Sequence, residues 1–137
     1  MVFLPSSLNG CGCYNAAMPM KRLQIVNRTR LLRQPLSVRL CDTFSCRFLG
    51  LMGRRSIAED DGLLFVWPRE GRDTAIHMLF MRFPIAVVWL DGARRVVDAR
   101  LLKPWVGFGV PRSPARYVLE LHPVRLAEFQ IGDEVTW

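Results

Sequence analysis

The sequence lacks the short motifs that mark the common enzyme classes. It has no Gly-x-Ser-x-Gly elbow, no phosphate-binding loop and no dinucleotide-binding glycine pattern. It also lacks a helix-turn-helix pattern, an RNA-binding signature and zinc-finger ligand spacing. These absences favour a non-catalytic role over an enzyme, and they give no reason to expect a cofactor.

The sequence also lacks a long uninterrupted apolar run. Its longest apolar stretch, TAIHMLFMRFPIAVVWLD, covers residues 74–91 and is interrupted by Arg82 and Pro84. A membrane-spanning helix needs roughly 18 to 20 continuous apolar residues. We therefore expect no membrane span.

Residues 1–20 contain no charged side chain. A secretory signal begins with basic residues and continues into an apolar core, and here Pro5 breaks the only short apolar run. We interpret residues 1–20 as a disordered tail or a mis-assigned start, with Met18 or Met20 as the alternative first residue. Residues 21–137 are then expected to form one domain in the cytoplasm.

Positive charge is concentrated early in the expected domain. Residues 21–55 hold nine Lys and Arg against a single acid, Asp42. This asymmetry allows a polyanionic partner such as nucleic acid. The residues that such a partner would contact are Arg28, Arg30, Arg33, Arg54 and Arg55.

The apolar stretch within residues 74–91 predicts the central strand of the domain. Two sets of apolar residues alternate along positions 85–90, so both faces of this strand are expected to be buried. Asp91 and Gly92 predict a tight hairpin turn with positive φ angles. The chain is then expected to return as a strand over residues 94–102.

Other elements follow from local patterns. Alternation predicts strands over residues 21–27 and 36–40, paired as a second hairpin, and short strands over 63–67, 116–121 and 134–137. Phe44, Phe48 and Leu51 lie at helical spacing, which predicts a helix within residues 42–53 that buries these three side chains and ends at Gly53. Residues 123–129 predict one or two helical turns, and residues 103–115 a long irregular loop.

A series of ordered motifs resembles the domain of unknown function 192 family, a widespread prokaryotic family. The motifs are Gly50-Leu51-Met52-Gly53-Arg54, Gly62-Leu63-Leu64-Phe65, His77-Met78, Pro84, Asp91, Tyr117-Val118-Leu119-Glu120-Leu121 and Ile131-Gly132-Asp133. The resemblance covers about residues 22–137. It implies a mainly β fold with one or two short helices, arranged as a small, partly closed β-barrel with antiparallel or mixed strands.

The middle motif departs from the family pattern. His77 stands where the family usually has Trp, Phe80 and Met81 replace polar residues, and Ala86 replaces an aspartate. Any chemistry that depends on that aspartate in relatives is unavailable here. A shared structural or binding role is therefore easier to retain than a shared mechanism.

Metal binding has little support in the sequence. Cys41 and Cys46 supply two ligands, whereas a structural zinc site needs about four. We expect these cysteines to be reduced and buried. His77, Met78 and Met81 are soft donors that suit Cu(I), but such residues in an apolar run are more often part of the core.

Glu120 is the best candidate for a buried acid because its neighbours on the strand are apolar. A buried carboxylate needs a partner, and Arg54 or Arg82 could provide a structural ion pair. The alternative is a general acid or base. Trp105, in the Gly/Pro-rich loop, either lines a pocket mouth or caps the open end of the barrel.

Three functional hypotheses remain. The leading one is a non-catalytic domain that binds a small ligand or a protein partner near His77, Arg82 and Trp105, with Arg54 and Glu120 as further candidate contacts. The first alternative is a nucleic-acid-associated module that uses the early arginines. The second is an enzyme centred on Glu120.

Overall fold

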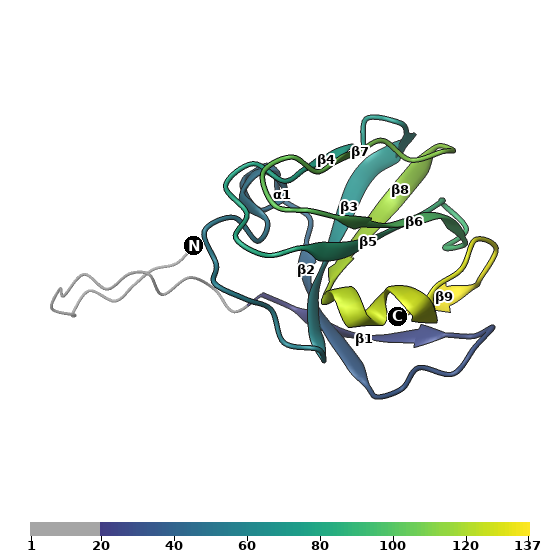
Figure 1. Ribbon diagram of the computed structural model, residues 1–137. Coiled ribbons are helices and arrows are strands. Elements are labelled where there is room, and N and C mark those ends of the chain that lie inside the picture. The colour runs from purple at the N-terminus through teal and green to yellow at the C-terminus, as the bar shows by residue number, and fades with distance from the viewer. Residues whose placement is uncertain (1–19) are drawn as a thin grey trace, which may run out of the picture.

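The computed structural model describes residues 20–137, and the predicted tail lies outside them apart from Met20 (Figure 1). Most of the strands form a seven-stranded sheet in the order β6-β5-β8-β3-β2-β1-β9. Their bounds are β1 Arg22–Asn27, β2 Leu36–Cys41, β3 Asp61–Gly71, β5 Ile85–Leu90, β6 Val96–Leu102, β8 Ala115–Leu121 and β9 Val135–Thr136. The short strands β4 (Ile76–His77) and β7 (Phe108–Gly109) pair separately, and the helices are α1 (Phe44–Leu49) and the 3₁₀ helix η1 (Pro123–Glu128).

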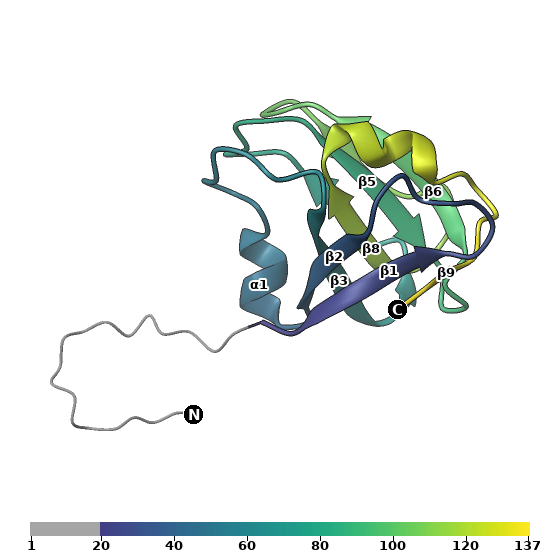
Figure 2. The same cartoon turned by 90° about the horizontal axis from the view of Figure 1, so that it is seen from below.

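The sheet curls until its two ends meet. The chain just before β6 reaches the chain just before β9 through a bridge between Arg95 and Glu134. On one side of it, the N–H of Val96 donates to Asp133 O at 2.9 Å, and on the other the N–H of Val135 donates to Arg94 O at 3.0 Å. The predicted mainly β, partly closed barrel is therefore confirmed. Figure 2 shows the strands wrapped into this half-barrel, with η1 across one opening.

The predicted central strand is confirmed as β5, in which every residue is buried. Ile85, Val87 and Trp89 join one apolar cluster, and the alternate residues join the other. The second cluster fills the inside of the curled sheet. The first lies on the outer face, beneath α1 and the β4–β7 ribbon. Such burial on both faces explains why β5 lacks a polar side.

The β5–β6 hairpin is confirmed, but the prediction for its turn is wrong in detail. Gly92 is not among the glycines with positive φ, and Arg94 instead has a φ of 65°. The carboxylate of Asp91 accepts hydrogen bonds from the N–H groups of Ala93 and Arg95, both at 2.9 Å. The Asp91 side chain therefore organises a longer turn, which closes at Arg94.

The predicted helix exists but is shorter than expected and buries none of its own residues. Thr43 caps its start by accepting from Cys46 N at 3.2 Å, and the helix ends at Leu49 because Gly50 leaves the helical region with a φ of 48°. Phe44 and Phe48 are 76% and 60% exposed, so the prediction that they face the core is wrong. Their rings stack on each other instead.

Strand β3 is longer than predicted, because it continues past Pro68 to Gly71 with an irregularity between Val66 and Gly71. It pairs with β2 in parallel and with β8 antiparallel. The parallel pairing requires a crossover connection, and α1 lies within it. This crossover carries α1 to the outer face of the sheet, close to β8.

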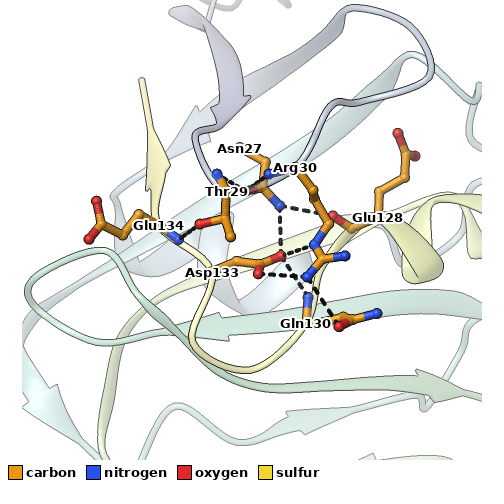
Figure 3. Close-up of polar contacts among 7 residues, drawn as sticks. All are labelled: Asn27, Thr29, Arg30, Glu128, Gln130, Asp133 and Glu134. Atoms are coloured by element: carbon orange, nitrogen blue, oxygen red, sulfur yellow. Dashed lines mark hydrogen bonds and ion pairs between the residues drawn. The ribbon is translucent and has the colours of Figure 1, made fainter.

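A polar cluster fastens the two chain ends of the domain (Figure 3). Asp133 accepts from Arg30 Nε at 2.6 Å, from Asn27 Nδ2 at 2.9 Å and from Gln130 N at 2.9 Å. Burial raises the pKa of Asp133, but the hydrogen bonds from Arg30, Asn27 and Gln130 outweigh it and hold the pKa below its usual value. Because its carboxylate is well paired, we regard this cluster as structural.

Candidate functional site

Glu120 is the penultimate residue of β8, where the alternation along the strand turns its side chain to the same face as Val118 of the outer apolar cluster. Its direct neighbours across the sheet are Leu63 on β3 and Val87 on β5, both fully apolar. Only 6% of Glu120 is exposed. The prediction that Glu120 is buried is therefore confirmed.

The carboxyl group of Glu120 has an unpaired oxygen. Within residues 20–137, Oε2 has no hydrogen-bond partner, and neither Arg54 nor Arg82 forms an ion pair with it. The predicted structural ion pair is therefore wrong. Both arginines are exposed, and α1 with its following turn, rather than either of these two arginines, lies against Glu120.

Burial without a compensating charge raises the pKa of Glu120 to about 8. At neutral pH the group is therefore mainly a neutral carboxylic acid. In that form it donates one hydrogen bond and accepts others, unlike an ionised carboxylate, which only accepts.

A small cavity of about 60 Å³ leads to Glu120. Its walls come from α1 and the turn that follows it, from Trp67 within β3, and from β4 with its flanking residues. Gly50 forms part of the wall nearest the carboxyl group, since a Cβ atom there would lie 3.6 Å from Glu120 Oε2. The residues that line it include Arg47, Gly50, Trp67, Ala75, His77 and Glu120.

One wall of the cavity is fixed by Arg47. Its Nη1 atom donates to Asp42 O at 2.7 Å and to Val66 O at 3.0 Å, which ties α1 to β3. Its guanidinium lies 5.6 Å from the centre of the Trp67 ring. Arg47 and Trp67 therefore form a polar and aromatic edge, and sequence analysis assigned no role to either. The only local sign was an aromatic residue directly before Pro68.

His77 lines the same cavity as Glu120, so the structure brings these two predicted site residues together. Its Nδ1 accepts from Leu79 N at 3.3 Å, so a neutral ring carries its proton on Nε2. Trp105 is not part of the cavity lining; it is exposed and its ring packs edge-on against Phe80 at 5.2 Å.

The cysteine prediction needs correction. Cys41 and Cys46 are joined in a disulfide across the start of α1, whereas we expected reduced thiols.

Within residues 20–137, no group of three or more His, Cys, Asp or Glu side chains is arranged to hold a metal ion. The same part of the chain contains no helix long and apolar enough to cross a membrane. The predicted cytoplasmic location stays a prediction.

The five arginines of the nucleic-acid hypothesis are divided between two segments. Arg28, Arg30 and Arg33 lie in the β1–β2 connection, where Arg30 pairs with Asp133 and Arg33 with Glu59. The other two follow α1. Figures 1 and 2 both show α1 well separated from the β1–β2 connection. These five arginines therefore do not lie together in one segment of the fold. The nucleic-acid hypothesis stays a prediction.

Together the curled seven-stranded sheet, its outer crossover helix and its C-terminal 3₁₀ helix define a small, mainly β single-domain protein. The chain belongs to the domain of unknown function 192 family, described as an uncharacterized ACR, which it matches over residues 25–137. The resemblance predicted from the sequence motifs is therefore confirmed.

The chain is also similar to proteins named UPF0127 from Thermococcus and Pyrococcus species. The chain is 40% identical to a UPF0127 protein of Thermococcus kodakarensis over 116 residues, which are 82% of this chain and 72% of the relative. It is 38% identical to a UPF0127 protein of Pyrococcus furiosus, covering 82% of this chain and 97% of the relative.

Two crystal structures share the fold. One is a protein of Sinorhizobium meliloti described as a candidate transcription regulator, with a TM-score of 0.70 and 24% identity over 84% of this chain and 91% of that one. The other is a protein of unknown function from Novosphingobium aromaticivorans, with a TM-score of 0.68 and 18% identity over 86% and 85%. At these identities the likeness concerns the fold alone.

Proposed function

We propose that this domain binds a small neutral ligand, or the end of a larger one, through a hydroxyl or amide group that hydrogen-bonds with Glu120. The observation that carries the proposal is the unpaired Oε2 atom, buried at the end of a cavity. Buried polar groups in proteins are nearly always hydrogen-bonded, and an unpaired one costs about 1 to 3 kcal/mol. A ligand that supplies the missing partner recovers that free energy.

The electrostatics of the site favour a neutral group over a cation. The carboxyl group is mainly protonated at neutral pH, so it offers a donor as well as an acceptor. An ammonium group would have to approach past Arg47 at the cavity wall. A hydroxyl or amide group carries no charge, so Arg47 does not repel it. Such a group can also satisfy both the donor and the acceptor of the acid.

The size of the cavity limits what enters it. A volume of about 60 Å³ accepts roughly a few non-hydrogen atoms. The rest of a larger ligand would therefore remain at the mouth, where His77 and Trp67 offer a ring nitrogen and an aromatic face. This agrees with the leading hypothesis from the sequence at His77, and it moves the binding site away from Trp105 toward Glu120.

The proposal is tested by an NMR screen of small alcohols, amides and amines against the ¹⁵N-labelled protein. We expect alcohols or amides to shift the backbone signals of Gly50, Ala75 and His77. Glu120→Gln keeps the shape and retains a donor and an acceptor but cannot ionise, Glu120→Leu removes both hydrogen-bonding capacities, and Ala75→Leu fills the cavity. Ala93→Leu adds the same bulk in the exposed β5–β6 turn and is the matched control.

The expected result is binding by the wild type, by Ala93→Leu and by Glu120→Gln, at least about tenfold weaker binding by Glu120→Leu, and no binding by Ala75→Leu. The affinity of the wild type should fall as the pH rises through 8, because ionisation removes the donor, whereas the affinity of Glu120→Gln should not change. Equal binding by Ala75→Leu and the wild type would refute the site. Binding of amines alone, strengthening with pH, would refute the neutral ligand class.

A second candidate function is catalysis with Glu120 as general acid or base. It is favoured by the raised pKa of Glu120 together with His77 in the same cavity, because such pairs occur at catalytic sites. Glu120→Gln would then fold normally and lose a reaction on a ligand found in the screen. A bound ligand that remains chemically unchanged with the wild type would contradict this alternative.

A further inference from the structure

A separate feature of the surface is a group of apolar side chains at the β4–β7 end of the molecule. Two loops carry it: residues 78–81 after β4, and residues 103–107 before β7. We call the aromatic tip the set of exposed residues Leu79 (48%), Phe80 (61%), Trp105 (55%), Val106 (80%) and Phe108 (63%). Figure 1 shows β4 and β7 together, on the opposite side of the molecule from β1 and β9.

The two loops are held together as one unit around the fully buried Met78. Its N–H donates to Gly107 O at 3.0 Å, and its carbonyl accepts from Trp105 N at 2.8 Å. Gly107 is required at this turn, because a Cβ atom there would lie 2.5 Å from Lys103 O and 2.8 Å from Met78 Cγ. The aromatic tip is therefore built on a fixed support rather than on independent loops.

The backbone holds the rings of Phe80 and Trp105 outward at some cost. Phe80 and Trp105 have φ angles of 62° and 67°, a region that bulky residues rarely adopt. Such strain persists only where surrounding contacts enforce it, and it is concentrated at functional sites. Here the strained residues are the ones that present the aromatic pair to solvent.

The two loops beside the aromatic tip carry charge of one sign. Residues 78–82 and 103–108 contain Arg82 and Lys103 but no Asp or Glu. Exposed cations flank the tip directly: Arg82 lies two residues after Phe80, and Lys103 lies two before Trp105. Arg54 adjoins Gly53, whose N–H donates to Phe80 O at 3.3 Å. Within residues 20–137, Arg54, Arg82 and Lys103 form no ion pair.

From these observations we infer that the aromatic tip docks on an anionic lipid surface, with its apolar side chains at the headgroup level and the flanking cations on lipid phosphates. Apolar insertion and attraction to anionic lipids together determine the strength of such peripheral binding, and Trp favours the interface between lipid and water. The lack of carboxylates in the two loops of the tip matches a negatively charged surface.

Two other partners fit less well. A second copy of the chain would bring the same cations together across the contact, and like charges oppose that arrangement. Single-stranded nucleic acid needs accessible ring faces for stacking, but Leu79 and Val106 are aliphatic and Phe80 packs against Trp105. The inference does not depend on the proposed ligand site, because no residue of the aromatic tip lines that cavity.

The test is co-sedimentation with vesicles of phosphatidylcholine alone and of phosphatidylcholine mixed with phosphatidylglycerol. The variant Phe80→Asn/Trp105→Asn removes two of the three rings of the tip, and Asn tolerates positive φ, so the loops should keep their shape. The matched control is Leu31→Asn/Ile131→Asn, which removes apolar side chains that are 96% and 57% exposed elsewhere. Arg82→Gln/Lys103→Gln tests the contribution of the cations.

We expect the wild type and the control to bind the anionic vesicles, with salt weakening binding, and the Phe80/Trp105 variant to bind at least about tenfold less. The Arg82/Lys103 variant should bind less and depend less on salt. Tryptophan emission should shift to shorter wavelength on binding in every protein that retains Trp105.

Failure of the wild type to sediment with anionic vesicles at low salt would overturn the inference. So would equal sedimentation of the wild type and the Phe80/Trp105 variant, because binding would then use another surface. Binding of a single-stranded oligonucleotide or an acidic peptide through the same rings, without vesicle binding, would overturn the lipid assignment.

Discussion

Gly50 lies against the buried acid at Glu120: a Cβ atom built on Gly50 would be 3.6 Å from Oε2 of Glu120 and 3.4 Å from Cζ of Phe65. These residues are 70 positions apart in the chain, and the crossover through α1 brings them together. The end of α1 therefore controls how much solvent reaches the carboxyl group. The first prediction uses this contact.

Gly50→Ala should raise the pKa of Glu120 further above 8, because the added methyl group increases the burial of the carboxyl group without giving it a partner. The control is Gly53→Ala, which also has a positive φ but has nothing within 4 Å of the added Cβ. Both variants should lose about 1 kcal/mol of stability through backbone strain. A ¹³C titration of the glutamate carboxyl signals measures the pKa; an equal shift in both variants would contradict the contact.

The stability of the wild type should fall as the pH rises from about 4.5 to 8. The pKa of Glu120 is raised from 4.5 to about 8, so in this range the folded protein holds a proton that the unfolded chain has released. The stabilisation is complete below the unfolded pKa and is lost as the pH approaches the folded one. Urea unfolding across this range should show a flatter profile for Glu120→Gln, and identical slopes would show that Glu120 is not the titrating group.

Asp133 should produce the opposite dependence at acidic pH. Its pKa is held below the usual value, so its contribution to stability is present above about pH 4 and is lost as the pH falls further. Asp133→Asn should cost about 2 to 4 kcal/mol at neutral pH, since it removes a buried, charge-assisted acceptor. Its unfolding free energy should also fall less than that of the wild type below pH 4, as measured by chemical denaturation; an unchanged acid profile would argue against this role.

Reduction of the Cys41–Cys46 disulfide should loosen α1 specifically. The helix buries no residue of its own, so it is held mainly by its connections: the disulfide, the Thr43 cap and the hydrogen bonds of Arg47. Opening so short a covalent loop should cost about 2 kcal/mol.

Hydrogen exchange with and without reductant measures this effect. Amides of residues 46–50 should exchange faster after reduction, while those of β5 should keep most of their protection. A matched variant, Cys41→Ala/Cys46→Ala, should behave like the reduced wild type under both conditions. Unchanged exchange in α1 after full reduction would show that the other contacts suffice to hold the helix.

Local sequence patterns predicted the strands well where burial follows a simple period. β5 was identified from its apolar residues on both faces. β8 was identified because successive side chains alternate between its two faces, which places Leu119 on one face and Glu120 on the other. The β1–β2 and β5–β6 hairpins were also predicted, because neighbouring strands joined by short turns need only local information. The helical spacing of Phe44 and Phe48 gave a wrong prediction of burial. This spacing shows that the two side chains share one face of a helix, but not whether another element packs on that face.

The sequence by itself determined the family, the mainly β class and the burial of Glu120, because these depend on motifs and periodicity along the chain. Only the tertiary structure decided that Glu120 would meet Gly50 rather than Arg54 or Arg82, and that Phe80 and Trp105 would share one exposed tip. The physical reason is that such contacts join residues distant in sequence. Their formation depends on the parallel β2–β3 pairing and on the curl of the whole sheet, which no local pattern encodes.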